Sequence, residues 1–281
     1  MNYPILIFTP LLFILNSVVF SQPEFKTENI TPEVKNSMPE KSNIYRFLYI
    51  FPHPDDESYG PAAAIDKSIK AGDEVHLLTL TKGGATNNRI RLNLTVAEMG
   101  DVRYKEMLNV EKTLNLTSMT VLDFPDGGLK EINPLEIEKV IYDHIQKINP
   151  DIIITYPVHG ISGHNDHLVC HAAVKRVFME LKGKNNNLKR LVFWGLTQED
   201  NQKNESVEFK TIKAEETDCI VELSPENVEA AHKALDCYVT YKPTIEGSNI
   251  KKMVTKSISY DFFLEAFNPP LNSLTDNLVK N

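Results

Sequence analysis

Two short clusters of acidic residues and histidines could carry chemistry in this sequence. The first is residues 52–57, Pro-His-Pro-Asp-Asp-Glu, and the second is residues 163–167, Gly-His-Asn-Asp-His. Carboxylates and imidazoles held close together are costly to bury unless they pair with one another or bind a cation. We therefore interpret the two clusters as the halves of one site for a single zinc ion.

The spacing within each cluster suits metal binding. A catalytic zinc ion is usually held by three protein side chains, with a fourth position open for water. His53 and Asp56 are three positions apart across an expected strand-to-helix turn and can converge on one point. His164 and His167 have the same spacing at an expected helix start, with Asp166 near the N-cap. Two histidines and one carboxylate also suit iron(II) or cobalt.

The neighbouring side chains could supply proton transfer. A carboxylate at Asp55, beside an expected ligand, could accept a proton from metal-bound water, whose pKa falls to about 7. His164 would complement it near the metal by hydrogen-bonding a developing oxyanion and donating a proton to a leaving amine. Together these groups indicate metal-assisted hydrolysis of an amide.

Alternating strands and helices must position these groups. The apolar run at 47–51 is typical of a buried parallel strand, and open α/β sheets bind ligands at the carboxyl ends of such strands. The pattern predicts a Rossmann-like, three-layer α/β/α fold with a mostly parallel sheet. The expected strands are about 45–51, 75–81, 119–124 and 151–156. Three helices are expected between them: one that opens at Gly60-Pro61, one over about 96–114, and one that begins at Asn133-Pro134 and ends at Pro150.

The pattern is weaker toward the C-terminus. Strands are expected at 191–194 and 219–223 on either side of a polar loop at about 198–215, followed by a helix at about 225–235. Residues 257–267 are interpreted as a short amphipathic helix. We expect one domain over residues 44–281, with the part from about 198 the least well defined.

The N-terminal residues resemble a secretory signal peptide. Residues 1–21 contain no charged side chain and end in small residues before Gln22, which would become the new N-terminus. An uncleaved membrane anchor is the alternative, although Pro10 and Asn16 interrupt the apolar run. Residues 22–43 are polar and predict a flexible leader. The mature chain is thus expected to be secreted or periplasmic, with no integral membrane domain.

Composition excludes several other classes. The 281 residues are 42% hydrophobic and carry a net charge of −8, which argues against binding of nucleic acid. The loop at Gly83-Gly84 has neither a P-loop ending nor a G-x-G-x-x-G spacing, so a dinucleotide is not expected. Cys170, Cys219 and Cys237 are too few for a disulfide scaffold and lack metal-site spacing. A Cys219–Cys237 bridge and free thiols both remain open.

The two clusters, in this order, resemble the LmbE-like (PIG-L-type) zinc de-N-acetylase superfamily. The resemblance covers about 45–171, and Asn165 stands where the family most often has proline. Further matching residues lie in or between the clusters: 81–84, Glu98, Gly100, Arg103, Glu106, 125–127 and 155–157. The resemblance implies a Rossmann-like fold, one zinc ion, and removal of an N-acetyl or other N-acyl group from a substrate that contains an amino sugar.

The resemblance also implies residue roles. The metal ligands would be His53, Asp56 and His167, and Asp55 would be the general base. His164 would act as the acid or oxyanion partner, oriented by Asp166. Arg103 and Asp126 would bind substrate or support the ligands, with structural salt bridges as the equal alternative.

Competing interpretations remain for the clusters. The first could be a helix-capping turn, although capping does not require a histidine beside three acids. His171 lies four residues after His167 and could replace a ligand. A hydrolase of another bond, such as a phosphoester, would need a second carboxylate-rich ligand set for two-metal chemistry. A non-catalytic sugar-binding module would not need Asp55 and His164 together with the ligands.

Overall fold

The computed structural model describes residues 43–202, 208–253 and 256–279. The expected signal peptide and all but the last residue of the expected leader lie outside these ranges. Among the described residues, no helix has the length and apolar character needed to cross a membrane.

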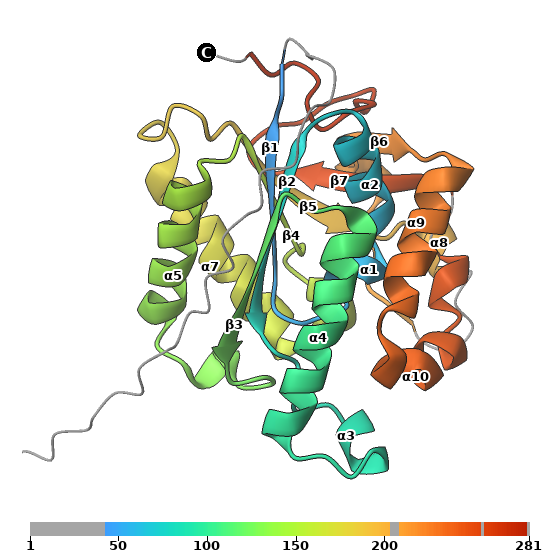
Figure 1. Ribbon diagram of the computed structural model, residues 1–281. Helices are drawn as coiled ribbons and strands as arrows, with labels where there is room; N and C mark the ends of the chain where they lie inside the picture. Colours follow the sequence, from blue (N-terminus) through green and yellow to red (C-terminus); the bar gives the residue numbers. More distant parts are fainter. Residues whose placement is uncertain (1–42, 203–207, 254–255, 280–281) are drawn as a thin grey trace, which may run out of the picture.

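One seven-stranded sheet runs through the molecule in the order β3-β2-β1-β4-β5-β7-β6 (Figure 1). The first five of these positions are parallel, and β7 pairs antiparallel with both β5 and β6. The predicted mostly parallel α/β fold is therefore confirmed. The strands are β1 (Arg46–Phe51), β2 (Glu74–Thr81), β3 (Ser118–Phe124), β4 (Ile152–Thr155), β5 (Arg190–Gly195), β6 (Cys219–Glu222) and β7 (Ser257–Phe262).

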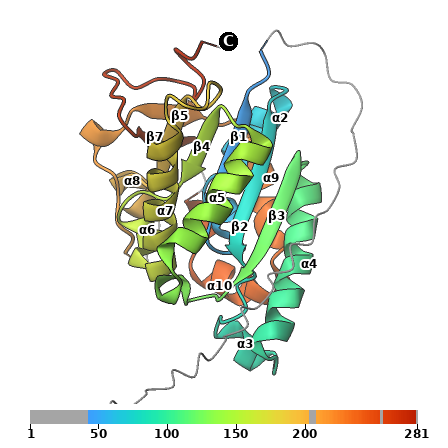
Figure 2. The same cartoon turned by 90° about the vertical axis from the view of Figure 1, so that its left-hand side faces the viewer.

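Helices cover both faces of the sheet (Figures 1 and 2). One face carries α2, α4 and α9, and the other carries α5 and α7. The helices are α1 (Asp56–Tyr59), α2 (Ala62–Lys70), α3 (Asn88–Arg91), α4 (Val96–Leu114), α5 (Pro134–Ile148), α6 (Gly160–Gly163), α7 (Asn165–Leu181), α8 (Gln198–Gln202), α9 (Pro225–Asp236) and α10 (Lys242–Gly247), with 3-10 turns η1 (Leu129–Glu131), η2 (Ala214–Glu216), η3 (Val239–Tyr241) and η4 (Ile250–Lys252).

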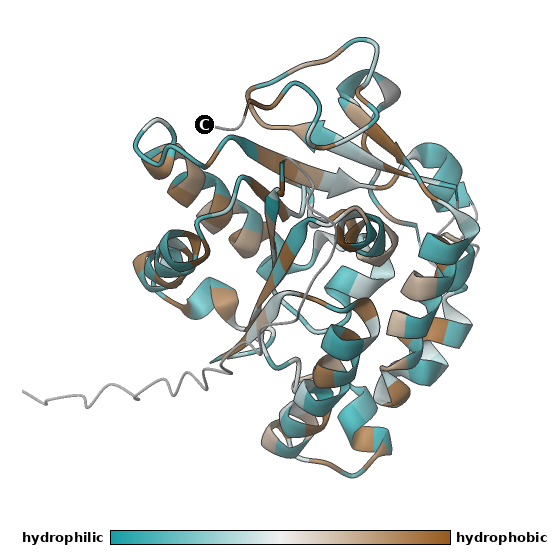
Figure 3. Ribbon diagram, turned by 45° about the horizontal axis from the view of Figure 1, so that its top comes forward, coloured by the Kyte–Doolittle hydropathy of each residue, from teal (hydrophilic) through white to brown (hydrophobic). Residues whose placement is uncertain are grey.

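Strand β1 is buried on both sides because it lies between two cores. Phe47, Tyr49 and Phe51 pack into the core beneath α2, α4 and α9, whereas Leu48 and Ile50 pack into the core beneath α5 and α7. Successive side chains of a strand point to opposite faces, so a continuous apolar run serves both cores. In Figure 3 the helices alternate between hydrophobic and hydrophilic residues, as expected for helices with one face on a sheet.

Local signals explain where the long helices begin and end. Thr95 and Glu98 form a reciprocal capping box at the start of α4, and Asn115 closes that helix in the left-handed conformation, with φ 57°. Asn133 caps α5 through the backbone N–H of Leu135. These ends agree with the bounds predicted from the sequence.

The prediction of a helix at residues 257–267 was wrong. Residues Ser257–Phe262 form β7, which lies between β5 and β6 in the sheet. Ile258, Tyr260 and Phe262 are buried while the residues between them are polar. This alternation of apolar and polar residues is typical of a strand, and the helical interpretation overlooked it; Ser259 is buried as well.

Candidate metal site and the surrounding pocket

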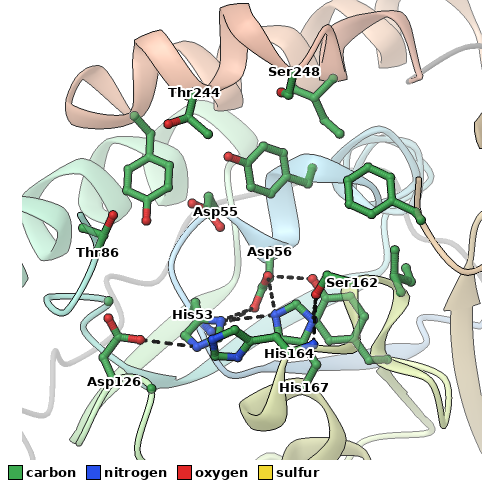
Figure 4. A pocket seen from close by; sticks show the side chains of 18 of the residues that line it. His53, Asp55, Asp56, Thr86, Asp126, Ser162, His164, His167, Thr244 and Ser248 are labelled. Carbon is green, nitrogen blue, oxygen red and sulfur yellow. Dashed lines mark hydrogen bonds and ion pairs between the residues drawn. The ribbon is translucent and has the colours of Figure 1, made fainter. Parts of the chain in front are cut away.

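The two clusters meet at the carboxyl ends of neighbouring strands. His53, Asp55 and Asp56 lie in the turn from β1 into α1, and His164 and His167 lie at the start of α7, which follows β4. Asp55 adopts a left-handed conformation with φ 87°. Such a conformation is unfavourable for a residue with a side chain and is found where the surrounding structure fixes a functional group. Figure 4 shows these side chains turned toward one pocket.

Three side chains form a compact triad of potential ligands. Nδ1 of His53 lies 3.3 Å from Nε2 of His167 and 3.5 Å from Oδ2 of Asp56. Nε2 of His167 lies 3.5 Å from Oδ1 of Asp56. A tetrahedral zinc site with bonds of about 2.0–2.1 Å has ligand atoms about 3.3–3.4 Å apart. The donor types of the triad therefore suit one zinc ion and the distances lie close to this range, with His53 and His167 approaching different oxygens of Asp56.

The outward-facing nitrogen of each histidine has an oxygen partner. Nε2 of His53 lies 3.1 Å from Asp166 and 3.3 Å from Asp126, while Nδ1 of His167 lies 2.8 Å from the carbonyl oxygen of Gly160. Histidines that bind a metal through one ring nitrogen almost always donate the other N–H to a carboxylate or carbonyl. These contacts would fix both rings with the correct nitrogen facing the triad.

Two further groups of potential ligand atoms overlap this triad. The atoms of His53, His164 and His167 lie within 4.8 Å of one another, as do those of His53, Asp126 and Asp166. The second group uses the Nε2 side of His53, opposite Asp56. The carboxylates of both groups accept backbone N–H groups, those of Asp126 and Asp166 from residues 85, 127 and 129 and that of Asp56 from His53, so these bonds do not distinguish them. A metal-bound histidine usually donates its other N–H to a carboxylate, which is the position of Asp166 and Asp126 at Nε2 of His53. We therefore assign the metal side to the triad with Asp56, and His164 lies beside it.

Asp166 does not hold His164 in the way the resemblance implied. Its fully buried carboxylate accepts the N–H groups of Gly127 at 2.8 Å and Leu129 at 3.1 Å and contacts His53. Burial acts to raise the pKa of Asp166, but these hydrogen bonds hold it below its ordinary value. Only the backbone N–H of Asp166 reaches His164, at Nδ1, so that His164 caps α7. Asp166 thus positions His53 rather than His164.

Asp55 lies beside the triad in a buried ion pair. Its Oδ2 accepts a hydrogen bond from Nη2 of Arg103 at 2.7 Å, and the same nitrogen donates to the carbonyl of Pro54 at 2.6 Å. The guanidinium also lies 3.8 Å from the ring centroid of Tyr241. Burial raises the pKa of Asp55 to about 7, although Arg103 opposes the shift. Arg103 therefore forms a buried salt bridge, which the sequence analysis had given as the alternative to substrate binding.

Tyr156 is a site residue to which the sequence analysis assigned no role. Its hydroxyl donates to Oδ1 of Asp56 at 2.6 Å, and its ring stacks on His167 with centroids 4.1 Å apart. Its position at the end of a predicted strand, at the same sheet edge as His53, was the available signal. His171 contacts the carbonyl of Tyr156 through Nδ1 at 2.9 Å and packs on Phe193. His171 therefore supports Tyr156 and is not part of the triad.

The charges around His53 favour a cation. Burial alone would lower the pKa of His53, but Asp166, Asp56 and Asp126 raise it to about 10. Three carboxylates thus stabilise positive charge at this point, and a bound metal ion would supply such a charge.

The site opens into a pocket of about 430 Å³. The triad, Asp55 and Asp126 line its floor, and Tyr241, Thr244, Ser248 and Ile250 from the C-terminal part of the chain also line it. Figure 4 shows Thr244 and Ser248 across the pocket from His53 and Asp126. The sequence analysis assigned no role to these C-terminal residues.

Comparison with solved structures shows which fold this chain shares. The structure resembles that of the A40926 pseudoaglycone deacetylase, with a TM-score of 0.62, 17% identity, and coverage of 80% of this chain and 100% of that one. It also resembles the 4-carboxy-2-hydroxymuconate hydratase of Pseudomonas putida KT2440, with a TM-score of 0.58, 12% identity, and coverage of 84% and 100%. At these identities the likeness shows a shared α/β fold, which serves more than one reaction.

Comparison of sequences gives the family. Residues 48–178, which contain both clusters, match the PIG-L family described as GlcNAc-PI de-N-acetylase. The chain is also 29% identical over 154 residues to a probable N-acetylglucosaminyl-phosphatidylinositol de-N-acetylase of Schizosaccharomyces pombe, covering 52% of this chain and 57% of that protein. The chain spans about half the length of the curated relatives it matches. The matched segment belongs to the PIG-L (LmbE-like) family.

Proposed function

We propose that this protein is a zinc-dependent hydrolase that removes an N-acetyl or other N-acyl group from a substrate containing an amino sugar. The observation that carries the proposal is the triad of His53, Asp56 and His167 with the ionisable carboxyl of Asp55 beside it. The relatives support the substrate class, because their names describe de-N-acetylases of N-acetylglucosamine compounds. The bond attacked is a linear amide outside peptides.

Each group has a defined task in this reaction. When bound, zinc would act as a Lewis acid on the amide carbonyl and lower the pKa of water. Asp55 accepts a proton from the attacking water, and Arg103 holds the carboxylate in place through its hydrogen bond. His164 stabilises charge on the carbonyl oxygen and donates a proton to the departing nitrogen. The carbon–nitrogen bond breaks, and the products are a free amine and a carboxylate.

The test is amine release from N-acetylated amino sugars by wild type and by Asp55→Asn. Asparagine keeps the shape of Asp55 but cannot accept the proton, so turnover should fall by about 10²–10⁴-fold while bound zinc stays near one per chain. Turnover equal in the two proteins would remove Asp55 as the base. Turnover that persists after zinc removal would refute the metal-dependent reaction.

We also propose that the chain is exported, from the uncharged, apolar character of residues 1–21. Mass spectrometry of the protein recovered outside the cytoplasm should find Gln22 at the N-terminus. An intact Met1 on a membrane-bound form would favour the anchor instead.

A further inference from the structure

The lining of the pocket differs chemically in the two directions that lead away from the catalytic residues. Thr86 and Asp126 follow β2 and β3, whereas Ile161 follows β4 and Trp194 belongs to β5. Because the sheet order is β3-β2-β1-β4-β5, these two sets flank the carboxyl end of β1, where His53 lies. A ligand at the triad therefore meets one set in each direction.

The side next to β2 and β3 offers oxygen atoms. Asp126 is held by the backbone N–H of Ala85 at 2.7 Å, and the hydroxyl of Thr244 accepts a hydrogen bond from Asn88 at 3.2 Å. Thr86 adds a second hydroxyl. Figure 4 shows Thr86 and Asp126 on the same side of Asp55 and His53. Carboxylate and hydroxyl oxygens suit the hydroxyl groups of a sugar.

The side next to β4 and β5 is an apolar wall. We use this name for five uncharged lining residues: Ile161, Trp194, Leu196, Phe209 and Ile250. All but Phe209 are at least nine-tenths buried. Ser162 and Ser248 line the pocket nearby and add hydroxyl groups only.

The structure holds the apolar wall in place. Trp194 packs directly on Gly60, where a Cβ atom would lie 1.7 Å from the indole ring. Phe209 is tied at both its backbone N–H and its carbonyl to the side chain of Asn201, at 3.0 and 3.1 Å. The wall is therefore formed before a ligand arrives, which reduces the entropy lost on binding.

We propose that the apolar wall binds the acyl chain of the substrate and that this chain is longer than acetyl. The inference rests on the proposed amide hydrolysis. An amide at the triad carries an amine part and an acyl part that leave it in opposite directions. The sugar hydroxyl groups match the oxygen-lined side, so the acyl part extends toward the wall. A single methyl group would fill little of a pocket of about 430 Å³, whereas a longer chain would contact more of the apolar wall and remove its own methylene groups from water.

The first test is amine release from glucosamine N-acylated with chains of two to eight carbons. Burial of a methylene contributes about 0.8 kcal/mol, so kcat/KM should rise about fourfold per methylene until the wall is covered. Two variants change the wall: Leu196→Asn, and Phe209→Ser at a half-buried residue. Both should reduce the gain in kcat/KM per methylene more than they reduce turnover of the acetyl substrate. The matched control is Val158→Asn, at a residue that is 70% exposed and outside the pocket lining; it should keep the full gain.

A binding measurement separates the two proposals. Trp194 is the only tryptophan in the sequence, so its fluorescence reports on the wall without any need for turnover. Octanoate should bind the zinc-loaded wild type at least 100-fold more tightly than acetate, and Phe209→Ser should narrow that ratio. Equal binding of the two acids, with acetylglucosamine as the best substrate, would overturn this inference and leave the deacetylase. Selective octanoate binding without hydrolysis of any amide would instead overturn the proposed function and the assignment of the wall to a substrate acyl chain.

Discussion

Replacing Arg103 by methionine should strongly destabilise the fold, because it leaves Asp55 as a buried carboxylate without its ion-pair partner. Arg103 is 1% exposed and Asp55 is 5% exposed, so water cannot replace the lost partner. Removing one member of a buried ion pair costs about 3–5 kcal/mol of unfolding free energy. The change also removes the hydrogen bond to Pro54 and the contact with Tyr241.

A double-mutant cycle isolates the ion pair from these other losses. In Arg103→Met/Asp55→Asn no buried charge is left alone, so the double variant should be more stable than Arg103→Met by about 2 kcal/mol. The cost of Arg103→Met should also be larger at pH 8 than at pH 5. Arg103 lowers the pKa of Asp55, so without it the carboxyl becomes neutral more readily as the pH falls, and a neutral carboxyl needs no counter-charge.

The assay is urea unfolding followed by circular dichroism, with a chelator present so that metal binding does not contribute to stability. Lys105→Met is the matched control, because it removes a cation from the exposed side of the same helix. It should change the unfolding free energy by less than about 0.5 kcal/mol. Strict additivity of the two single changes at Arg103 and Asp55, or a loss independent of pH, would refute the reasoning.

Three other changes have defined outcomes. Asp166→Asn should weaken zinc binding about 10–100-fold in a chelator competition, because the carboxylate orients His53. Burial and a neighbouring carboxylate raise the pKa of Asp261 to about 6, so this group lowers the stability of the wild type as the pH rises from about 4 to 6. Asp261→Asn should reduce that fall and gain about 1 kcal/mol of unfolding free energy at pH 7, since the group is partly exposed. Gly83→Ala should cost about 1–3 kcal/mol in urea unfolding, because φ is 66° and the new Cβ would lie 2.8 Å from Pro54.

Each of these three outcomes can fail in a recognisable way. Unchanged zinc affinity in Asp166→Asn would mean that His53 is held by other contacts. A variant of Asp261 that keeps the wild-type pH dependence would place the titration elsewhere. A fully stable Gly83→Ala would show that the loop after β2 can move away from Pro54.

The layers of the fold were predictable because each core strand and helix carries a local signal. The apolar run of β1, the capping box of α4 and the Asn-Pro start of α5 lie within the elements they define. The strand β7 was misread although apolar and polar residues alternate along it, because a six-residue segment gives only a weak periodic signal. Its place in the sheet depends on pairing with β5 and β6, which lie far from it in the chain or are joined to it by long connections.

The triad was also predictable, because His53 and Asp56 come from a single turn and His167 belongs to a second cluster expected at the same edge of the sheet. The supporting contacts were not, since they join residues far apart in the chain. Asp166 reaches His53 across 113 positions and Tyr156 reaches Asp56 across 100. The same holds for Thr244 and Ile250, which reach the pocket from the far C-terminal part. Spacing indicates which side chains can converge locally, whereas packing decides what surrounds them.

The most direct test of the account is the zinc content of the purified protein by mass spectrometry, compared with His167→Ala and with His171→Ala. The triad predicts about one zinc per chain in wild type and in His171→Ala. It predicts that His167→Ala retains little or no zinc. Absence of zinc from the wild type, with none taken up when zinc is added, would contradict the claim that the two clusters form one metal site.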